Sequence, residues 1–382
     1  MNIENQTELR EAVIKRITAG EDCIAVLREA AEQGDAICQL VYGVNVRNKD
    51  WWMKAVNQDC AYACVFAALW NADDDELAAK YFAKAAMKGC LYAQFLWASY
   101  LDPSFEPFVH DSSYPMAMKV YKMAATNTAE LDEDLAFLVR LRETRVLALP
   151  KVIDDLCSTK YRSYAQSSIG CMFRDGRGVE RNITEAIAWF EKASADGEKD
   201  ALFRLGQLYN SDWAGKYMNS DKALSILMPL TDDDEFGALA QFEIGLNYWR
   251  RKDYKPAFKW FNKSAMAGNS QAQNSIGACY ESGRGVAKDH HKALEWLLLA
   301  AKQRHKLACG NIGRFYEYGR GVEKNKRKAR KWYLRAVRLG GEDVKDLCRV
   351  SRLKMNGEKS KISLSLLNVL GTGQKRKSVD NP

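Results

Sequence analysis

A pattern of about 36 residues that repeats along the chain constrains its fold more than any other feature. Ala201 follows Ala165 by 36 residues, and each begins a run with an aliphatic residue, a glycine and an aromatic residue at fixed spacing. At about 100° per residue these positions share one side of a helix. The run occurs five times, at Ala165/Ile169/Gly170/Phe173, Ala201/Leu205/Gly206/Tyr209, Ala240/Ile244/Gly245/Tyr248, Ala272/Ile276/Gly277/Tyr280 and Ala308/Ile312/Gly313/Tyr316.

A second helical pattern follows each of these runs. A small residue precedes a pair of large apolar residues, and a further small residue and often a glycine follow. It occurs at Ala186/Trp189/Phe190/Ala193/Gly197, Ala223/Ile226/Leu227/Leu230, Ala257/Trp260/Phe261/Ser264/Gly268, Ala293/Trp296/Leu297/Ala300 and Ala329/Trp332/Tyr333/Ala336/Gly340. Upstream copies are Cys23/Val26/Leu27/Ala30/Gly34, Trp51/Trp52/Ala55, Ala78/Tyr81/Phe82/Ala85/Gly89 and Ala117/Val120/Tyr121/Ala124, with Val152/Ile153/Leu156 as one more candidate. Two alternating helices in a repeated unit predict an all-α solenoid of stacked helix pairs.

The glycine inside the first helix predicts close packing. Glycine in a helix interior costs roughly 1 kcal/mol relative to alanine. Its return at the same helical phase therefore indicates that a neighbouring helix approaches closely at that point.

Residues typical of helix ends support the phase of the second helix. N-cap side chains accept a hydrogen bond from a free backbone N–H of the first turn. The expected N-caps are Asn182, Asn219, Asp253, Asp289 and Asn325, with Asp74 and Ser113 upstream. Gly-Arg-Gly-Val joins the two helices at residues 176–179, 283–286 and 319–322, which predicts a tight turn with positive φ. Two units lack this turn, at residues 212–213 and 251–252, so their loops are expected to differ.

The combined pattern resembles the Sel-1-like repeat, a relative of the tetratricopeptide repeat. The resemblance is strong over residues 165–340 and weaker over about 20–160. It implies a right-handed superhelical solenoid of antiparallel helix pairs whose concave face binds proteins or peptides. Some secreted bacterial members have a disulfide in each repeat, whereas the ten cysteines of this chain show no repeating spacing.

Four segments are expected from this pattern. Residues 1–160 would form degenerate helical repeats and residues 161–340 five clear ones, followed by a capping helix at 341–358 and a disordered tail at 359–382. The polar start lacks a secretory apolar run, and no stretch of about 18 apolar residues could span a membrane. Scattered cysteines favour free thiols in a reducing compartment, so we expect a cytoplasmic protein.

No motif predicts catalysis, a metal or a cofactor. The four histidines form no triad or zinc pattern, and Cys60 with Cys64 is better explained by core packing than by a metal pair. The Gly-Arg-Gly-Val turns could suggest a phosphate loop, but no Gly-Lys-Ser/Thr follows them. An enzyme would require a site hidden in the N-terminal half, which we keep as a third hypothesis.

The first hypothesis is a non-catalytic scaffold or adaptor that binds another protein or peptide. Its contacts would lie on first-helix positions two before, one after and five after the glycine. These are Arg204, Gln207, Glu243, Arg250, Asn311, Arg314 and Tyr318.

The second hypothesis is electrostatic binding of nucleic acid or an anionic surface through a basic end at residues 324–354. The basic residues are Lys324, Lys326, Arg327, Lys328, Arg330 and Lys331. A net charge of +8 over 382 residues is low for a nucleic-acid-binding protein, which favours the first hypothesis. Neither the partner nor the oligomeric state follows from the sequence.

Overall fold

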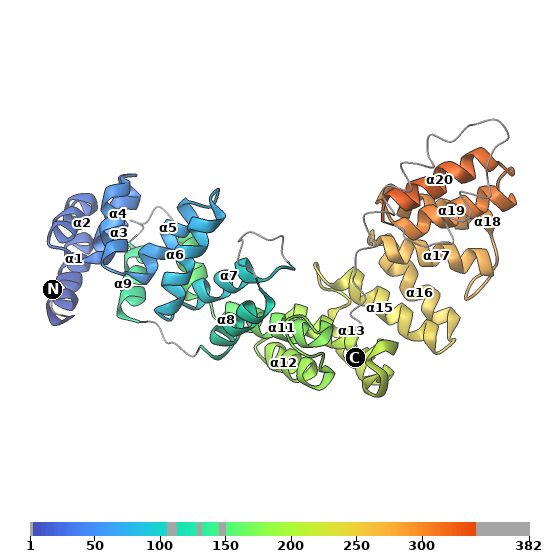
Figure 1. The fold of residues 1–382 in the computed structure, drawn as a ribbon, viewed down its shortest axis with the longest axis horizontal. Coiled ribbons are helices and arrows are strands. Elements are labelled where there is room, and N and C mark those ends of the chain that lie inside the picture. Colours follow the sequence, from blue (N-terminus) through green and yellow to red (C-terminus); the bar gives the residue numbers. More distant parts are fainter. Residues whose placement is uncertain (1–2, 105–112, 128–131, 145–149, 341–382) are drawn as a thin grey trace, which may run out of the picture. The chain divides into compact units, whose positions relative to one another are not determined.

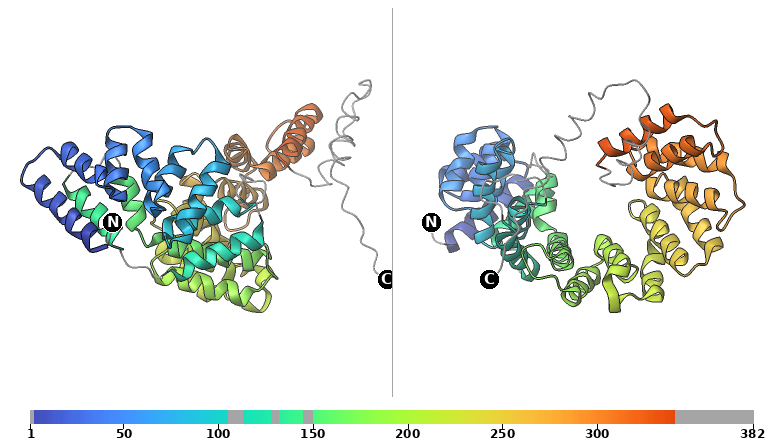
Figure 2. Two further views of the ribbon diagram at one scale, coloured as in Figure 1. Left: turned by 60° about the vertical axis from the view of Figure 1, so that its left-hand side comes forward. Right: turned by 45° about the vertical axis from the view of Figure 1, so that its right-hand side comes forward.

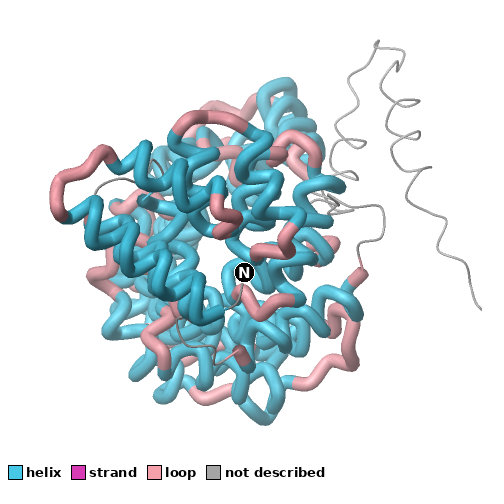
Figure 3. The backbone as a smooth tube through the Cα atoms, turned by 90° about the vertical axis from the view of Figure 1, so that its left-hand side faces the viewer, coloured by secondary structure: helices cyan, strands magenta, loops and turns pink. Residues whose placement is uncertain are grey.

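The fold was analysed in a computed structural model, which describes residues 3–104, 113–127, 132–144 and 150–340. These residues form twenty α-helices joined by turns and two short 3₁₀ segments, and they contain no β-strand (Figure 3). The predicted all-α fold is therefore confirmed. The capping helix predicted at residues 341–358 and the tail predicted at 359–382 lie outside the described residues.

The chain divides into two compact units, one ending at Leu230 and the other beginning at Thr231. In both, the helix with the Ala/Gly pattern, or its upstream counterpart, is the first helix of a pair and packs on the helix that follows it (Figure 1). The pairs of the first unit are α1 (Ile3–Thr18) with α2 (Cys23–Glu32), α3 (Ala36–Asn45) with α4 (Lys49–Asn57), α5 (Ala61–Trp70) with α6 (Asp75–Met87), α7 (Leu91–Leu101) with α8 (Tyr114–Thr126), α11 (Lys160–Asp175) with α12 (Ile183–Ala195), and α13 (Lys199–Tyr209) with α14 (Ser220–Leu227).

The described residues of the second unit, up to Gly340, form three pairs that follow one another in sequence order (Figure 2). They are α15 (Gly237–Arg250) with α16 (Tyr254–Met266), α17 (Ser270–Ser282) with α18 (His290–Lys302), and α19 (Lys306–Tyr318) with α20 (Lys326–Arg338). Within this unit α16 also packs on α17 and α18 on α19, so the inner helices of the stack are buried between two neighbours.

Two helices of the first unit interrupt this alternation. They are α9 (Glu133–Glu143) and α10 (Pro150–Cys157), and α11 stacks directly on α8 as though they were absent. The segment Val152/Ile153/Leu156 is therefore helical, but α10 does not take the place of a second helix in the stack. We call α9 and α10 the inserted helices.

A recurring buried glutamine confirms that α8 and α11 are consecutive. In four first helices the glutamine Nε2 donates to a carbonyl near the end of the preceding second helix. The pairs are Gln39 with Ala31, Gln94 with Ala86, Gln166 with Ala125, and Gln273 with Ala265. Because Gln166 on α11 contacts α8 in the manner that Gln39 on α3 contacts α2, the inserted helices do not alter the stacking rule.

The glycines of the first helices have the packing role that their spacing predicts. A Cβ at Gly245 would lie 2.5 Å from the Phe261 ring, closer than real Cβ contacts allow. In each pair the glycine faces the residue after the tryptophan position of the second helix. These contacts are Gly170 with Phe190, Gly206 with Leu227, Gly245 with Phe261, Gly277 with Leu297, and Gly313 with Tyr333.

The predicted helix caps are confirmed at all but one position. The side chains that accept a first-turn N–H belong to Asn182, Asn219, Asp289, Asn325, Asp74 and Ser113. Asp253 makes no such bond, so this prediction was wrong. Its ψ of 73° departs from the extended backbone of the other caps, because the chain enters α16 from a short turn in which Lys252 has a φ of +65°. All six glycines of the Gly-Arg-Gly-Val turns have positive φ, as predicted.

Candidate binding surfaces

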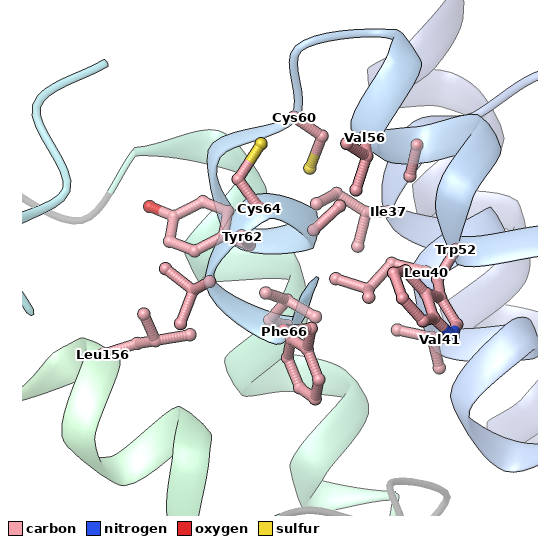
Figure 4. Packing of buried hydrophobic residues seen from close by; sticks show 14 of the residues in the cluster. Ile37, Leu40, Val41, Trp52, Val56, Cys60, Tyr62, Cys64, Phe66 and Leu156 are labelled. Carbon is pink, nitrogen blue, oxygen red and sulfur yellow. The ribbon is translucent and has the colours of Figure 1, made fainter. Parts of the chain in front are cut away.

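The described part of the chain contains no group of three or more His, Cys, Asp or Glu side chains that could hold a metal ion. Cys60 and Cys64 are buried in the apolar cluster of Figure 4, beside Val56 and Tyr62. Burial raises the pKa of the Cys60 thiol to about 12. Both cysteines pack as side chains of this apolar core. Across the described residues, every helix is too short or too polar to cross a membrane.

A polar network joins the first helices α17 and α19 in the second unit. Asn311 on α19 donates to the side chain of Asn274 on α17 at 2.9 Å and accepts from Arg314 at 2.9 Å. Arg314 and Arg320 both pair with Glu281 of α17, Arg314 at 3.4 Å. We call Asn274, Glu281, Asn311, Arg314, Tyr318 and Arg320 the α17–α19 surface.

Two of the predicted contact residues are available on this surface. The Tyr318 side chain is 54% exposed, and the Arg320 guanidinium lies 5.3 Å from its ring. Arg314 is half-buried, and 33% of its side chain is exposed. With two arginines and one glutamate the surface has an excess of positive charge, and an aromatic ring stands beside it.

The remaining predicted residues of the second unit lie on α15. Arg250 is exposed at the end of the helix. Glu243 is only 7% exposed, so a partner could reach little of it. The helical wheel gives the direction of a side chain, but the amount of surface left free depends on the helix packed beside it.

Arg204 and Gln207 belong to α13 of the first unit, where both are half-buried. Arg204 pairs with Asp200 one turn earlier, and Asp200 also accepts a hydrogen bond from the Ser167 hydroxyl of α11 at 3.1 Å. The pKa of Arg204 is raised: burial lowers it, but the electrostatic interactions with Cys171 and Asp200 and the hydrogen bond that Arg204 donates to Asp200 outweigh that. This arginine is therefore held in a fixed place between two first helices.

The predicted basic end includes α20. This helix has seven Lys or Arg residues and no Asp or Glu. Its apolar side is buried through Ala329, Tyr333 and Ala336. Of the residues predicted for the patch, all but the half-buried Arg330 are exposed; the exposed ones are Lys324, Lys326, Arg327, Lys328 and Lys331.

A further surface, which the sequence did not predict, lies in the first unit where α9 packs on α1 and α5. Arg10 of α1 pairs with Asp134 of α9 at 2.8 Å and with Asp35 at 2.9 Å. The Tyr62 hydroxyl of α5 donates to Asp132 at 2.8 Å. The only sequence signal was an acidic first turn followed by leucines at residues 132–141, which is common to many amphipathic helices.

The sequence profile of the Sel1 repeat matches residues 72–90, 163–198, 238–269, 270–305 and 306–341. No curated protein matches the chain. The 3₁₀ segment Asp212–Tyr217 replaces the Gly-Arg-Gly-Val turn between α13 and α14, a pair that lies outside the matched segments.

Solved structures with the same kind of repeat are similar to this chain. A Sel1 repeat protein from Oxalobacter formigenes is 25% identical, with a TM-score of 0.52, and the match covers 71% of this chain and 96% of that protein. A protective antigen of uropathogenic Escherichia coli with an SLR fold is 21% identical and matches over 100% of this chain and 99% of its own, with a TM-score of 0.31. The first of these structures supports the same helical repeat architecture.

Proposed function

We propose that the chain, in which five segments match the Sel1 repeat within a stack of helix pairs, binds another protein or a peptide through the α17–α19 surface. Arrays of this kind offer extended surfaces for protein recognition. The repeated residues maintain the stack, so specificity must come from side chains that differ between repeats. Arg314 and Tyr318 are such side chains, and the proposed role is recognition without catalysis.

The hydrogen-bonded position of Arg314 is the observation that favours this surface. Its Nη2 is held by Asn311 and Glu281, so little side-chain freedom remains to be lost on binding. Arginine and tyrosine are the residue types that most often dominate interface energetics. We infer a partner segment with a carboxylate for the arginines and an apolar side chain for Tyr318.

The test compares two double variants of the full chain in capture from native lysate, followed by titration of the captured partner. Arg314→Ala with Tyr318→Ala should weaken binding by roughly 30-fold, the effect of losing about 2 kcal/mol at a central contact. Arg327→Ala with Lys331→Ala on α20 is the matched control and should leave the affinity within about threefold. If the first variant binds like the wild type while remaining folded, the α17–α19 surface is not the binding site.

A second candidate function is electrostatic binding through α20. The observation that favours it is the charge of this helix, which has seven Lys or Arg residues and no Asp or Glu. Its affinity for nucleic acid or anionic vesicles would fall steeply between about 50 and 200 mM salt. In the experiment above, loss of binding in the α20 variant alone would favour this function over the first.

A further inference from the structure

The inserted helix α9 covers the side of the N-terminal repeats that is formed by their first helices α1, α3 and α5, which we call the first-helix side. Its apolar residues Leu135, Leu138 and Leu141 are buried in the same cluster as Val13 of α1 and Phe66 of α5. Leu156 of α10 belongs to this cluster and lies beside Tyr62 in Figure 4. In Figure 1 the green α9 accordingly lies among the blue N-terminal helices.

The covered side corresponds to the side proposed for partner binding in the second unit. The first-helix glycine lies eight residues after the N-cap in α17, and the same count from Asp35 and Cys60 gives Gly43 in α3 and Ala68 in α5. Two residues before and one after this point, α19 has the polar pair Asn311 and Arg314. The same positions in α3 and α5 are apolar, and they are Val41, Val44, Phe66 and Leu69. The first helices α3 and α5 thus differ from α19 at the positions that a helix covers.

The polar contacts of α9 fix its orientation on this side. Asp132, just before α9, accepts a hydrogen bond from the Tyr62 hydroxyl, and Asp134 in the first turn pairs with Arg10. Near the end of α9, Arg140 pairs with Glu11 of α1, with one N–O distance of 3.0 Å. The Glu11 and Arg140 side chains are 58% and 43% exposed, so this pair adds little stability. Arg10 is 7% exposed and has a second partner outside α9, Asp35 before α3.

The junction of α1 with α9 is incompletely filled. Two pockets open to solvent along it, with volumes of about 620 and 340 Å³, and both are lined by Ile14, Thr18 and Arg140. Solvent-accessible space therefore remains beside α9 along α1, next to Ile14, Thr18 and Arg140.

We propose that the first-helix side of α1, α3 and α5 is a docking groove for an amphipathic helix of a partner protein, and that α9 occupies this groove in cis. The partner helix has a carboxylate at its start for Arg10 and Tyr62, and leucine or phenylalanine at the spacing of Leu135, Leu138 and Leu141. Such recognition of an apolar helix face in a groove is a common binding mode. This groove is in the first unit, so its test and that of the α17–α19 surface are independent.

The test opens the groove and offers a helix in trans. In the full chain, Leu138→Asp with Leu141→Asp removes the apolar stripe of α9, and the probe is a fluorescein-labelled peptide of residues 132–144. Fluorescence anisotropy should show binding to this variant at least tenfold tighter than to the wild type. A peptide with the same two aspartates is the matched control and should not bind. Tyr62→Phe in the opened chain should weaken binding by about tenfold, because a hydrogen bond to a charged group is lost.

Hydrogen exchange of the wild-type chain provides a second test that needs no destabilising change. Amides of α9 should exchange faster than those of α3 and α5, because α9 leaves the groove without unfolding of the stack. Exchange of α9 together with α5 by global unfolding would overturn the proposal. The proposal would also be overturned if the opened variant stays helical but fails to bind the peptide. Unfolding of α1–α8 in that variant would overturn it as well. Concentration-dependent dimerisation of the wild type through exchange of α9 would assign the groove to a second copy and also overturn it.

Discussion

Replacing Gly245 with alanine tests the contact between the two helices of a repeat. A Cβ at this position would lie 2.5 and 2.7 Å from two ring carbons of Phe261. The ring is 2% exposed and is flanked by Phe242 and Trp249, with ring centroids 5.7 and 6.1 Å away. It therefore has little room to retreat, so the helices must move apart or the ring must leave its rotamer.

The expected magnitude follows from two opposing effects. Alanine is favoured over glycine in a helix interior by roughly 1 kcal/mol. Forcing an extra methyl into a packed site costs about 1–3 kcal/mol, and the rigid ring places this case near the upper value. We therefore expect Gly245→Ala to reduce the local free energy of unfolding by about 2 kcal/mol.

The assay is hydrogen exchange of the α15 and α16 amides, because repeat arrays need not unfold in one step. Gly277→Ala is the matched control: its Cβ would lie 2.7 and 2.8 Å from Leu297, whose flexible side chain can adjust more easily than a ring. It should cost less than half as much. Phe261→Leu combined with Gly245→Ala should recover about 1 kcal/mol relative to the sum of the single changes. A stabilising effect of Gly245→Ala would refute the reasoning, since it would show that the glycine is not required by packing.

Three further predictions concern single residues. Burial raises the pKa of the Cys90 thiol above its ordinary value, to about 11. As pH rises, this thiol therefore ionises in the unfolded state before it does so in the folded state, which lowers the free energy of unfolding. Urea titrations between pH 8 and 11 should show the wild type losing stability relative to Cys90→Ala. A difference between the two that does not change with pH would contradict this. Gln273→Leu removes the Nε2 donor to the carbonyl of Ala265, which keeps its bond from the Gly268 N–H at 3.1 Å, and should therefore cost about 0.5–1.5 kcal/mol by hydrogen exchange of α16 and α17; no loss would show that the contact is dispensable. At Gly321 φ is +63°, and a Cβ added there would lie 2.8 Å from the His290 backbone. Gly321→Ala should therefore lower the melting temperature by several degrees. An unchanged melting temperature would show that the turn adapts.

The fold of the repeats could be predicted from the sequence because the decisive contacts are local. The spacing of Gly245 and Phe261 places one opposite the other within a single pair, so periodicity alone suggests their contact. The recurring glutamine contacts were not predicted, although Gln39, Gln94 and Gln273 have the same role. Glutamine is common on exposed helix surfaces, and nothing in its identity signals a buried bond to the preceding helix.

The binding surfaces were only partly predictable. The helical wheel places Asn311 and Arg314 on one side of α19, but their bonds to Asn274 and Glu281 depend on the neighbouring repeat. The position of α9 could not be inferred at all. Arg140 meets Glu11 across 129 residues of sequence, and no local periodicity reports such a contact.

That long-range contact also bears on how the chain is made. A stack in which each helix contacts its neighbours can form progressively as the polypeptide emerges from the ribosome. The apolar residues of α3 and α5 up to Phe66 are synthesised more than seventy residues before Leu141. They are covered by α9 only after Leu141 has been added. At about 5–20 residues per second this interval lasts roughly 4–15 seconds. During it, the nascent chain exposes a helix-binding side without its own helix, which makes this the stage of synthesis at which chaperones would have most to bind.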